Sequence, residues 1–302
     1  GSIVDRIGRR KLIGGGLAGV VGLAILGRSP TDDHLTQAEN HLATLATTVD
    51  ETNLANPQQS RPLREDVTST TESVNAALSQ DSPDDDETTR RITALETATA
   101  YYSRLAVVLD VATRLRRGVA GSERVVPDHD GPLPYDPTTE FDTAALTEQI
   151  TRLAESEVGT VTTPTGRSLV PDQQRVVDAL REQHEVYDQH ITAQQAYLDT
   201  SATIEAGVRA HERSQFDAAR STLETAQNTM TAGTPSSEDG YRLFGAGLSL
   251  DQYTTVFSLR SEGVVRLIDV CDPSLSDRKR RSGANDALDR FFDARDLVIG
   301  RT

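Results

Sequence analysis

The chain has 302 residues, with 46 acidic and 31 basic side chains and a formal net charge of −15. This length allows one large domain or two smaller ones, each able to bury a hydrophobic core. The diffuse acidity argues against nucleic-acid binding, which requires a basic surface. The single cysteine, Cys271, excludes an internal disulfide, and its place in an apolar run predicts a small core residue.

Lysine is nearly absent from this acidic chain. Only Lys11 and Lys279 occur, and all other bases are arginine. Carboxylates keep a surface hydrated where water is scarce, and molar salt screens their mutual repulsion. Arginine, unlike lysine, can pair with them bidentately. The composition therefore resembles that of proteins from extreme halophiles such as the haloarchaea.

Residues 1–30 form a basic head followed by a short apolar segment. The uncharged, glycine-rich run Leu12–Gly27 would span about 24 Å as a helix, less than the ~30 Å hydrocarbon core of a bilayer. This is the anatomy of a signal peptide, and an uncleaved membrane anchor or a buried core helix are the alternatives. The bases that precede the run place the N-terminus inside and the remaining chain outside. The core of the motif resembles a twin-arginine export signal, which consists here of Arg9, Arg10, Lys11, Leu12 and Ile13.

Residues 31–118 are expected to form an N-terminal helical bundle. Apolar residues recur at spacings of three and four from Leu35 to Val49, and again on a second helix that starts at about Pro62. Ser82 and Pro83, followed by acids, predict the start of a third helix of about thirty residues that Gly118 can close. The acids of this cluster are interpreted as capping groups, because the spacing and the glycine of a calcium-binding loop are missing.

Residues 119–141 are rich in proline and are expected to be a linker or a functional loop. Asp128, His129 and Asp130 lie inside this segment and are candidate metal ligands. Adjacent side chains rarely converge on one ion without partners elsewhere, so a solvated loop is the simpler interpretation.

Residues 142–302 are expected to form a C-terminal helical region. A short helix and a second proline-containing loop precede a very long helix from Asp172 to about Glu212. The long helix carries His184 and Asp188, which lie one turn apart and could bind a metal on one face. The pattern lacks the second histidine of a metalloprotease helix.

One stretch of the C-terminal region resembles a tetratricopeptide helix pair. A small residue lets two helices approach, an aromatic residue packs at the turn and alanines admit the partner helix. These positions are Gly207, Phe216, Ala219, Leu223 and Ala226. The pattern does not recur 34 residues later, so a generic helical hairpin is the alternative to a repeat array.

Two further helices are expected, at about 249–271 and 282–299. The basic run Arg278–Arg281 is placed in the preceding loop, because four bases at a helix N-terminus would oppose the helix dipole. The fold class is therefore all-α, with long amphipathic helices in an antiparallel bundle or a helical-hairpin array and one N-terminal membrane or signal helix.

Three classes of function remain open. The first is a non-catalytic, membrane-tethered or secreted interaction protein or scaffold of a halophile, without a cofactor, with a protein partner or self-association. The second is an extracytoplasmic ligand-sensing or solute-binding bundle, in which tyrosines would line a pocket. The third is a metal-dependent enzyme built on the candidate metal ligands. The candidate pocket residues are Tyr101, Tyr102, Tyr187 and Tyr197.

Overall fold

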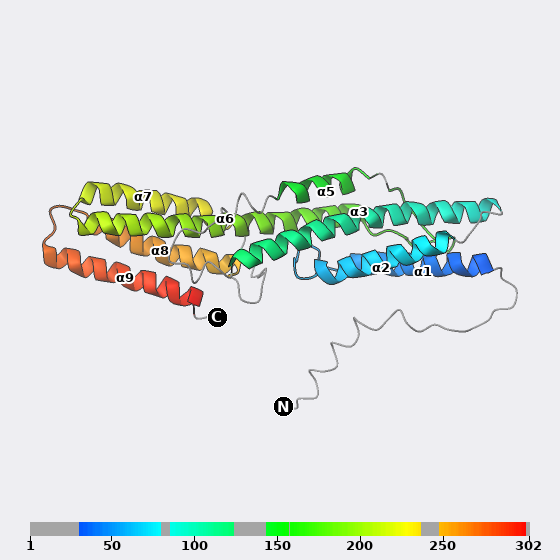
Figure 1. The fold of residues 1–302 in the computed structure, drawn as a ribbon, viewed down its shortest axis with the longest axis horizontal. Helices are drawn as coiled ribbons and strands as arrows, with labels where there is room; N and C mark the ends of the chain where they lie inside the picture. Colours follow the sequence, from blue (N-terminus) through cyan, green and yellow to red (C-terminus); the bar gives the residue numbers. More distant parts are fainter. Residues whose placement is uncertain (1–29, 80–84, 124–142, 157, 237–247, 300–302) are drawn as a thin grey trace, which may run out of the picture.

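The computed structural model describes residues 30–79, 85–123, 143–156, 158–236 and 248–299. Within these residues the protein is all-helical, as predicted, and its only pairing of extended backbone is an isolated bridge between Thr162 and Ser168. The molecule is elongated, and the helices lie roughly along its long axis (Figure 1).

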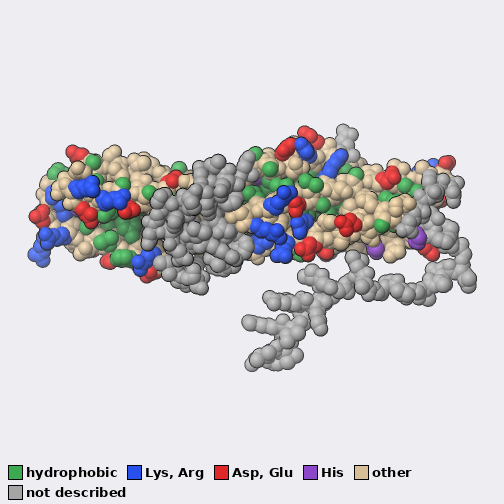
Figure 2. Space-filling model, viewed as in Figure 1, with side chains coloured by type: hydrophobic (Ala, Val, Ile, Leu, Met, Phe, Trp, Pro, Cys, Tyr) green, Lys and Arg blue, Asp and Glu red, His purple; other side chains and the backbone are tan. Residues whose placement is uncertain are grey.

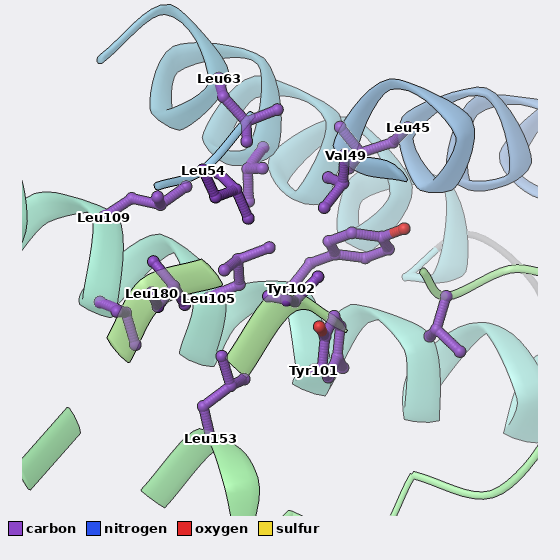
Figure 3. Packing of buried hydrophobic residues seen from close by; sticks show 14 of the residues in the cluster. Leu45, Val49, Leu54, Leu63, Tyr101, Tyr102, Leu105, Leu109, Leu153 and Leu180 are labelled. Atoms are coloured by element: carbon purple, nitrogen blue, oxygen red, sulfur yellow. The ribbon is translucent and has the colours of Figure 1, made fainter. Parts of the chain in front are cut away.

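Five helices build the N-terminal bundle: α1 (Pro30–Glu51), α2 (Ser60–Leu78), α3 (Asp86–Glu123), α5 (Ala144–Ala154) and the first half of α6 (Gln173–Glu212). The predicted stripe of α1 is buried, from Leu35 to Val49. The core also takes in Tyr101 and Tyr102 of α3, which lie between α1, α2 and α6 with the leucines of those helices (Figure 3).

Two boundaries of α3 differ from the prediction. The helix begins at Asp86, and Asp85 caps it by accepting a hydrogen bond of 2.7 Å from the backbone N–H of Thr88. That bond lowers the pKa of the Asp85 carboxyl. At the other end the helix continues through Gly118 to Glu123. Val119, just beyond this glycine, is fully buried in the core, so its tertiary packing outweighs the stop signal.

The C-terminal bundle contains the second half of α6, α7 (Phe216–Gly233), α8 (Leu250–Val270) and α9 (Asp277–Ile299). These helices form two antiparallel hairpins, α6 with α7 and α8 with α9. Cys271 is buried beside Leu267, in keeping with the expected core position.

The start of α9 corrects the prediction that Arg278–Arg281 lies in a loop. The helix begins at Asp277 and includes the basic run. Arg280 donates to the carbonyl oxygens of Asp272 and Pro273 and lies 4.4 Å above the ring of Phe216. These contacts, together with the acid at Asp277, offset the unfavourable dipole interaction.

The two bundles share α6 as a spine. The buried residues form one hydrophobic cluster that ends at Ile191 and a second that begins at Ala193. The packing therefore changes from one bundle to the other inside a continuous helix of 40 residues, which is about 60 Å long. Helix α5, which follows the proline-rich segment in the sequence, packs with the N-terminal bundle.

Candidate interaction groove on the C-terminal bundle

Helix α8 is the centre of the C-terminal bundle, since it contacts α6, α7 and α9. Gln252 fixes the start of α8, because its side-chain oxygen accepts a hydrogen bond of 3.1 Å from the N–H of Ser249. The helix is then buried along one broad face that includes Tyr253, Phe257 and Val264. The opposite face of α8 has no helix against it among the described residues.

Arg260 fastens α8 to the spine. Its guanidinium donates to the carbonyl oxygen of Tyr197 at 3.1 Å, to the Thr200 hydroxyl at 3.2 Å and to the Ser201 hydroxyl at 2.8 Å. It also lies 4.1 Å from the centre of the Tyr197 ring. Burial lowers the pKa of this guanidinium. Five donors in a rigid plane suit such a site, which lysine could not satisfy.

Helix α9 packs against α8 at two close approaches. A Cβ atom added to Gly263 would come within 2.9 Å of the Phe291 ring, and one added to Gly283 would collide with Val270. Two ion pairs flank this contact on one side: Arg290 with Glu262 at 3.2 Å and Arg266 with Asp286 at 4.0 Å. Because the four side chains are partly exposed, these ion pairs contribute little to the stability of the fold. They do show which flank of α9 faces the outward side of α8.

The outward face of α8 is the floor of a groove with a volume of about 930 Å³. The C-terminal end of α7 is one wall, through Met230, Thr231 and Thr234. Glu262 and Arg266, which pair with α9, form the other side. The volume of the groove exceeds those of three other pockets in the described part of the chain, which are about 590, 400 and 200 Å³.

The groove combines apolar patches with hydroxyl groups and a few charges. Val265, which is 40% exposed, supplies the apolar surface of the floor, while Phe257 and Met230 of the lining are buried. The hydroxyls of the floor come from Thr254, Ser258 and Ser261. The lining runs from Thr254 to Asp269, which is about 24 Å along a helix axis. A groove of this length and chemistry fits the apolar face of an amphipathic helix.

The structure brings the candidate ligands His184 and Asp188 together on one face of α6. The Nδ1 atom of His184 lies 3.4 Å from an Asp188 carboxylate oxygen. Each residue also contacts the α5 region, since Thr147 Oγ1 lies 2.8 Å from His184 Nε2 and Thr143 Oγ1 donates to Asp188 at 2.6 Å. This arrangement joins α5 to α6. Within the described ranges no group of three or more histidine, cysteine or acidic side chains could hold a metal.

The other candidate metal ligands, Asp128, His129 and Asp130, lie outside the described residues. So do Arg9, Arg10, Lys11, Leu12 and Ile13 of the export motif. Among the helices that the structure describes, none has the length and apolar character needed to cross a membrane.

The tyrosines considered as a pocket lining occupy two environments. Tyr101, Tyr102 and Tyr187 are buried in the N-terminal core, where burial raises the pKa of each phenol. The Tyr187 hydroxyl donates to the carbonyl of Ala112 at 3.2 Å. Tyr197 instead supports Arg260. None of the four lines the groove on α8.

The residues of the tetratricopeptide-like pair lie at the α6–α7 contact. Ala219, Leu223 and Ala226 are fully buried. A Cβ atom on Gly207 would come within 2.7 Å of the Leu223 side chain, so this glycine permits the close approach of the two helices. Phe216 lies at the turn, where its ring contacts His211. The α8–α9 hairpin packs beside this pair without repeating its sequence pattern.

Sequence reasoning did not identify the groove. Its floor is a line of serine, threonine and valine at helical spacing, from Thr254 through Ser258 and Ser261 to Val265. In a linear sequence this line is indistinguishable from an ordinary solvated helix face. The apolar residue of this line is Val265. That it is exposed becomes clear only once the packing of α7 and α9 is known.

Comparison of the chain with protein-family models, with curated proteins and with solved structures finds no match.

Proposed function

We propose that the protein is a non-catalytic helical interaction or scaffold protein of a halophile, held at the membrane by its N-terminal segment or secreted after its removal. The observation that carries this proposal is the groove on the outward face of α8. It offers apolar surface rimmed by polar groups, which is the usual composition of a helix-binding surface.

The shape of the molecule supports a tethered role. Helix α1 starts at one end of the elongated body, and the C-terminal bundle forms the other end (Figure 1). The apolar run Leu12–Gly27 precedes α1 in the chain, so a tether there would leave the groove at the far end. The continuous spine α6 holds this separation, because one helix enters both cores.

The charge of the body supports a setting of high salt. Residues 1–30 contain five bases and one acid and so carry a charge of +4. Because the whole chain carries −15, residues 31–302 carry −19. Acidic and basic side chains both lie on the surface shown in Figure 2, with arginine in short-range pairs with carboxylates. Such pairs keep a carboxylate-rich surface compatible with molar salt.

Site-specific photo-crosslinking in the native cells tests the interaction role. A photoreactive amino acid at Ser258 lies on the groove floor, and the matched control at Thr225 lies on an exposed face of α7 away from the groove. We expect a discrete crosslinked product from position 258 and none from position 225. If position 258 gives no product, or both positions give the same products, the groove is not an interaction site.

The membrane tether is tested separately. Replacing Arg9 and Arg10 by lysine removes the twin-arginine pair but keeps the charge of the segment. We expect the variant to remain inside the cell, protected from added protease, while the wild-type body is cleaved from outside. Equal protease sensitivity of the two proteins would contradict export through this segment.

A further inference from the structure

Two turns make the end of the molecule that lies farthest from the start of α1. The turn between α6 and α7 and the turn between α8 and α9 lie together there (Figure 1). Arg280 joins them, because its guanidinium lies 4.4 Å from the centre of the Phe216 ring and donates to the carbonyl oxygens of Asp272 and Pro273. This end, residues 211–220 and 269–282, is called the tip.

The tip has a slight excess of bases in a chain that is otherwise strongly acidic. It holds six bases and five acids and so carries a formal charge of +1, while the rest of the chain carries −16. Its Lys279 is the only lysine of residues 31–302. Lys and Arg side chains protrude at this end in Figure 2. The bases are Arg213, Arg220, Arg278, Lys279, Arg280 and Arg281, and the acids are Glu212, Asp217, Asp269, Asp272 and Asp277.

Two of these bases have contacts that serve the fold. Arg280 pairs with Asp277 at 3.7 Å, in addition to the contacts described above. Arg220 faces Asp272 on the neighbouring turn. Hydrogen bonds from Ser274 lower the pKa of the Asp272 carboxyl, and the charges of Arg220 and Arg280 lower it further. Arg220 and Arg280 are therefore matched by acids of the tip itself.

The other four bases have no such contacts. Arg213, Arg278, Lys279 and Arg281 are exposed, and their side chains form no ion pair or hydrogen bond within the described residues. Three of them stand in the first turn of α9, where they repel one another and oppose the positive end of the helix dipole. At about 100° per residue, they fan around the sides of the helix that Arg280 leaves open. A cluster that costs stability and does not serve the fold indicates a ligand.

The surroundings of the four bases favour a polypeptide over a uniform polyanion. A phosphate chain or an anionic membrane would also place negative charge against the exposed acids Glu212 and Asp217. A protein segment can instead place carboxylates opposite the bases and neutral or basic groups opposite these acids. The tip also offers some apolar surface, because Pro273 is exposed and Phe216 and Leu275 are half-buried.

We propose that the tip is a second interaction surface, which binds an acidic segment of a partner protein through the four exposed bases. The inference goes beyond the groove on α8, since these bases do not line that groove. Arginine can bind a carboxylate through two parallel hydrogen bonds. Contacts at this range depend less on long-range attraction, which salt screens.

A binding titration with a synthetic acidic peptide tests the proposal. A fluorescent peptide rich in glutamate is added to the full chain in detergent, at the lowest salt concentration at which circular dichroism shows an intact fold. The control peptide has glutamine in place of each glutamate. We expect the chain to bind the glutamate peptide and not the glutamine peptide, and the binding to weaken as salt is added.

Neutralising the tip should remove this binding. Arg278→Gln/Lys279→Gln/Arg281→Gln should bind the glutamate peptide at least about tenfold more weakly, because three exposed charge pairs are lost. Arg213→Gln, on the other turn, should weaken binding as well, although it leaves α9 unchanged. The triple variant should melt at a temperature no lower than the wild type, because it removes bases that oppose the helix dipole.

A matched variant controls for net charge. Arg90→Gln/Arg104→Gln/Arg117→Gln makes the same change of charge at exposed positions of α3, in the N-terminal bundle. This variant should bind the glutamate peptide like the wild type, because its changes lie far from the tip.

Four results would overturn the proposal. They are a wild-type chain that does not distinguish the two peptides, an equal loss of binding in the α3 variant, a lower melting temperature of the triple tip variant, and tighter binding of inorganic polyphosphate than of the glutamate peptide. The third would show that the bases serve the fold, and the fourth that the ligand is a uniform polyanion. The photoreactive probe at Ser258 reports on the groove, so the tip and the groove can each fail without the other.

Discussion

The N-terminal and C-terminal bundles share one spine helix but are held together in different ways. In the N-terminal bundle, large side chains fill the space between helices, and Arg91 of α3 forms a buried ion pair with Glu39 of α1. In the C-terminal bundle, helices approach closely at small residues, and a Cβ atom would collide with a neighbouring helix at Gly207, Gly233, Gly263 and Gly283.

This difference determines how each bundle can be damaged. A core built on bulk and buried charge is weakened by removing atoms, because the loss leaves a cavity or an uncompensated charge. A core built on close backbone approach is weakened by adding atoms, because the helices must separate. The difference also explains the free surfaces of the C-terminal bundle: α9 packs on α8 with little contact to α6 or α7, so both its outer flank and the groove stay open.

The largest effect is expected from Arg91→Leu in the N-terminal bundle. Arg91 donates to both carboxylate oxygens of Glu39, at 2.7 and 3.1 Å, and the two side chains are only 12% and 9% exposed. Removing one partner of a buried pair typically costs about 3–5 kcal/mol, because the remaining charge stays desolvated. We expect the free energy of unfolding to fall by that amount in chemical denaturation.

Two variants control for this prediction. The double variant Arg91→Leu/Glu39→Leu removes both charges and should recover most of the loss. Arg152→Ala breaks the exposed pair with Glu148, whose side chains are 63% and 57% exposed, and should cost less than about 1 kcal/mol. An Arg91 variant as mild as the Arg152 variant would show that the N-terminal bundle does not depend on its buried charge.

A smaller effect, of the opposite kind, is expected from Gly233→Ala in the C-terminal bundle. The added Cβ would collide with the Cβ of Ala196 on α6. Overpacking of this kind costs about 1–3 kcal/mol, and the higher helix propensity of alanine returns up to about 1 kcal/mol. We expect a net loss of about 1–2 kcal/mol, measured by denaturation, with faster hydrogen exchange in α7.

A compensating change sharpens this test. Ala196→Gly on the facing helix restores the space, so the double variant should be more stable than Gly233→Ala alone. Gly159→Ala is the control, since nothing lies within 4 Å of a Cβ at that position. If Ala196→Gly makes the Gly233 variant worse, the two helices do not approach each other as described.

Most helices were predictable from the sequence because their apolar residues repeat at helical spacing. The stripe from Leu35 to Val49 lies in α1, and the predicted long helix from Asp172 to Glu212 lies within two residues of α6 (Gln173–Glu212). Helix ends were less predictable. The sequence favoured Ser82 as the cap of α3, and the structure shows Asp85 in that role; several neighbouring acids and hydroxyls are suitable caps, so the local pattern does not choose among them.

The candidate site could be predicted only in part. The contact between His184 and Asp188 follows from their spacing on one helix, as does the packing of Gly207 against Leu223. The groove depends on how α8 packs against its neighbours: Arg260 joins α8 to α6, and Gly263 allows the close approach of α9. No local pattern encodes such an arrangement, because each partner looks ordinary in its own segment.

The smallest effect at neutral pH comes from the buried tyrosines, and it again separates the two bundles. Burial raises the pKa of Tyr101, Tyr102 and Tyr187, all in the N-terminal core, above the ordinary value of about 10. Because the folded pKa values lie above the unfolded ones, the neutral phenols stabilise the fold fully below pH ~10. This stability is lost as pH rises further, by up to ~1.4 kcal/mol per pH unit for each tyrosine.

Tyr102→Phe isolates one of these contributions. Its hydroxyl is buried without a hydrogen-bond partner within the described residues, so the variant should be at least as stable as the wild type at neutral pH. Above pH ~10 its stability should fall less steeply, by about 1.4 kcal/mol per pH unit. Tyr187→Phe should show the same reduced slope but cost about 1 kcal/mol at neutral pH, because it leaves the carbonyl of Ala112 without this donor.

Denaturation between pH 7 and 12, with hydrogen exchange of α3 and α8 peptides, measures both effects. Since the three tyrosines lie in the N-terminal core, α3 should lose protection at a lower pH than α8; earlier exchange in α8 would place the alkaline weakness in the glycine-packed bundle instead.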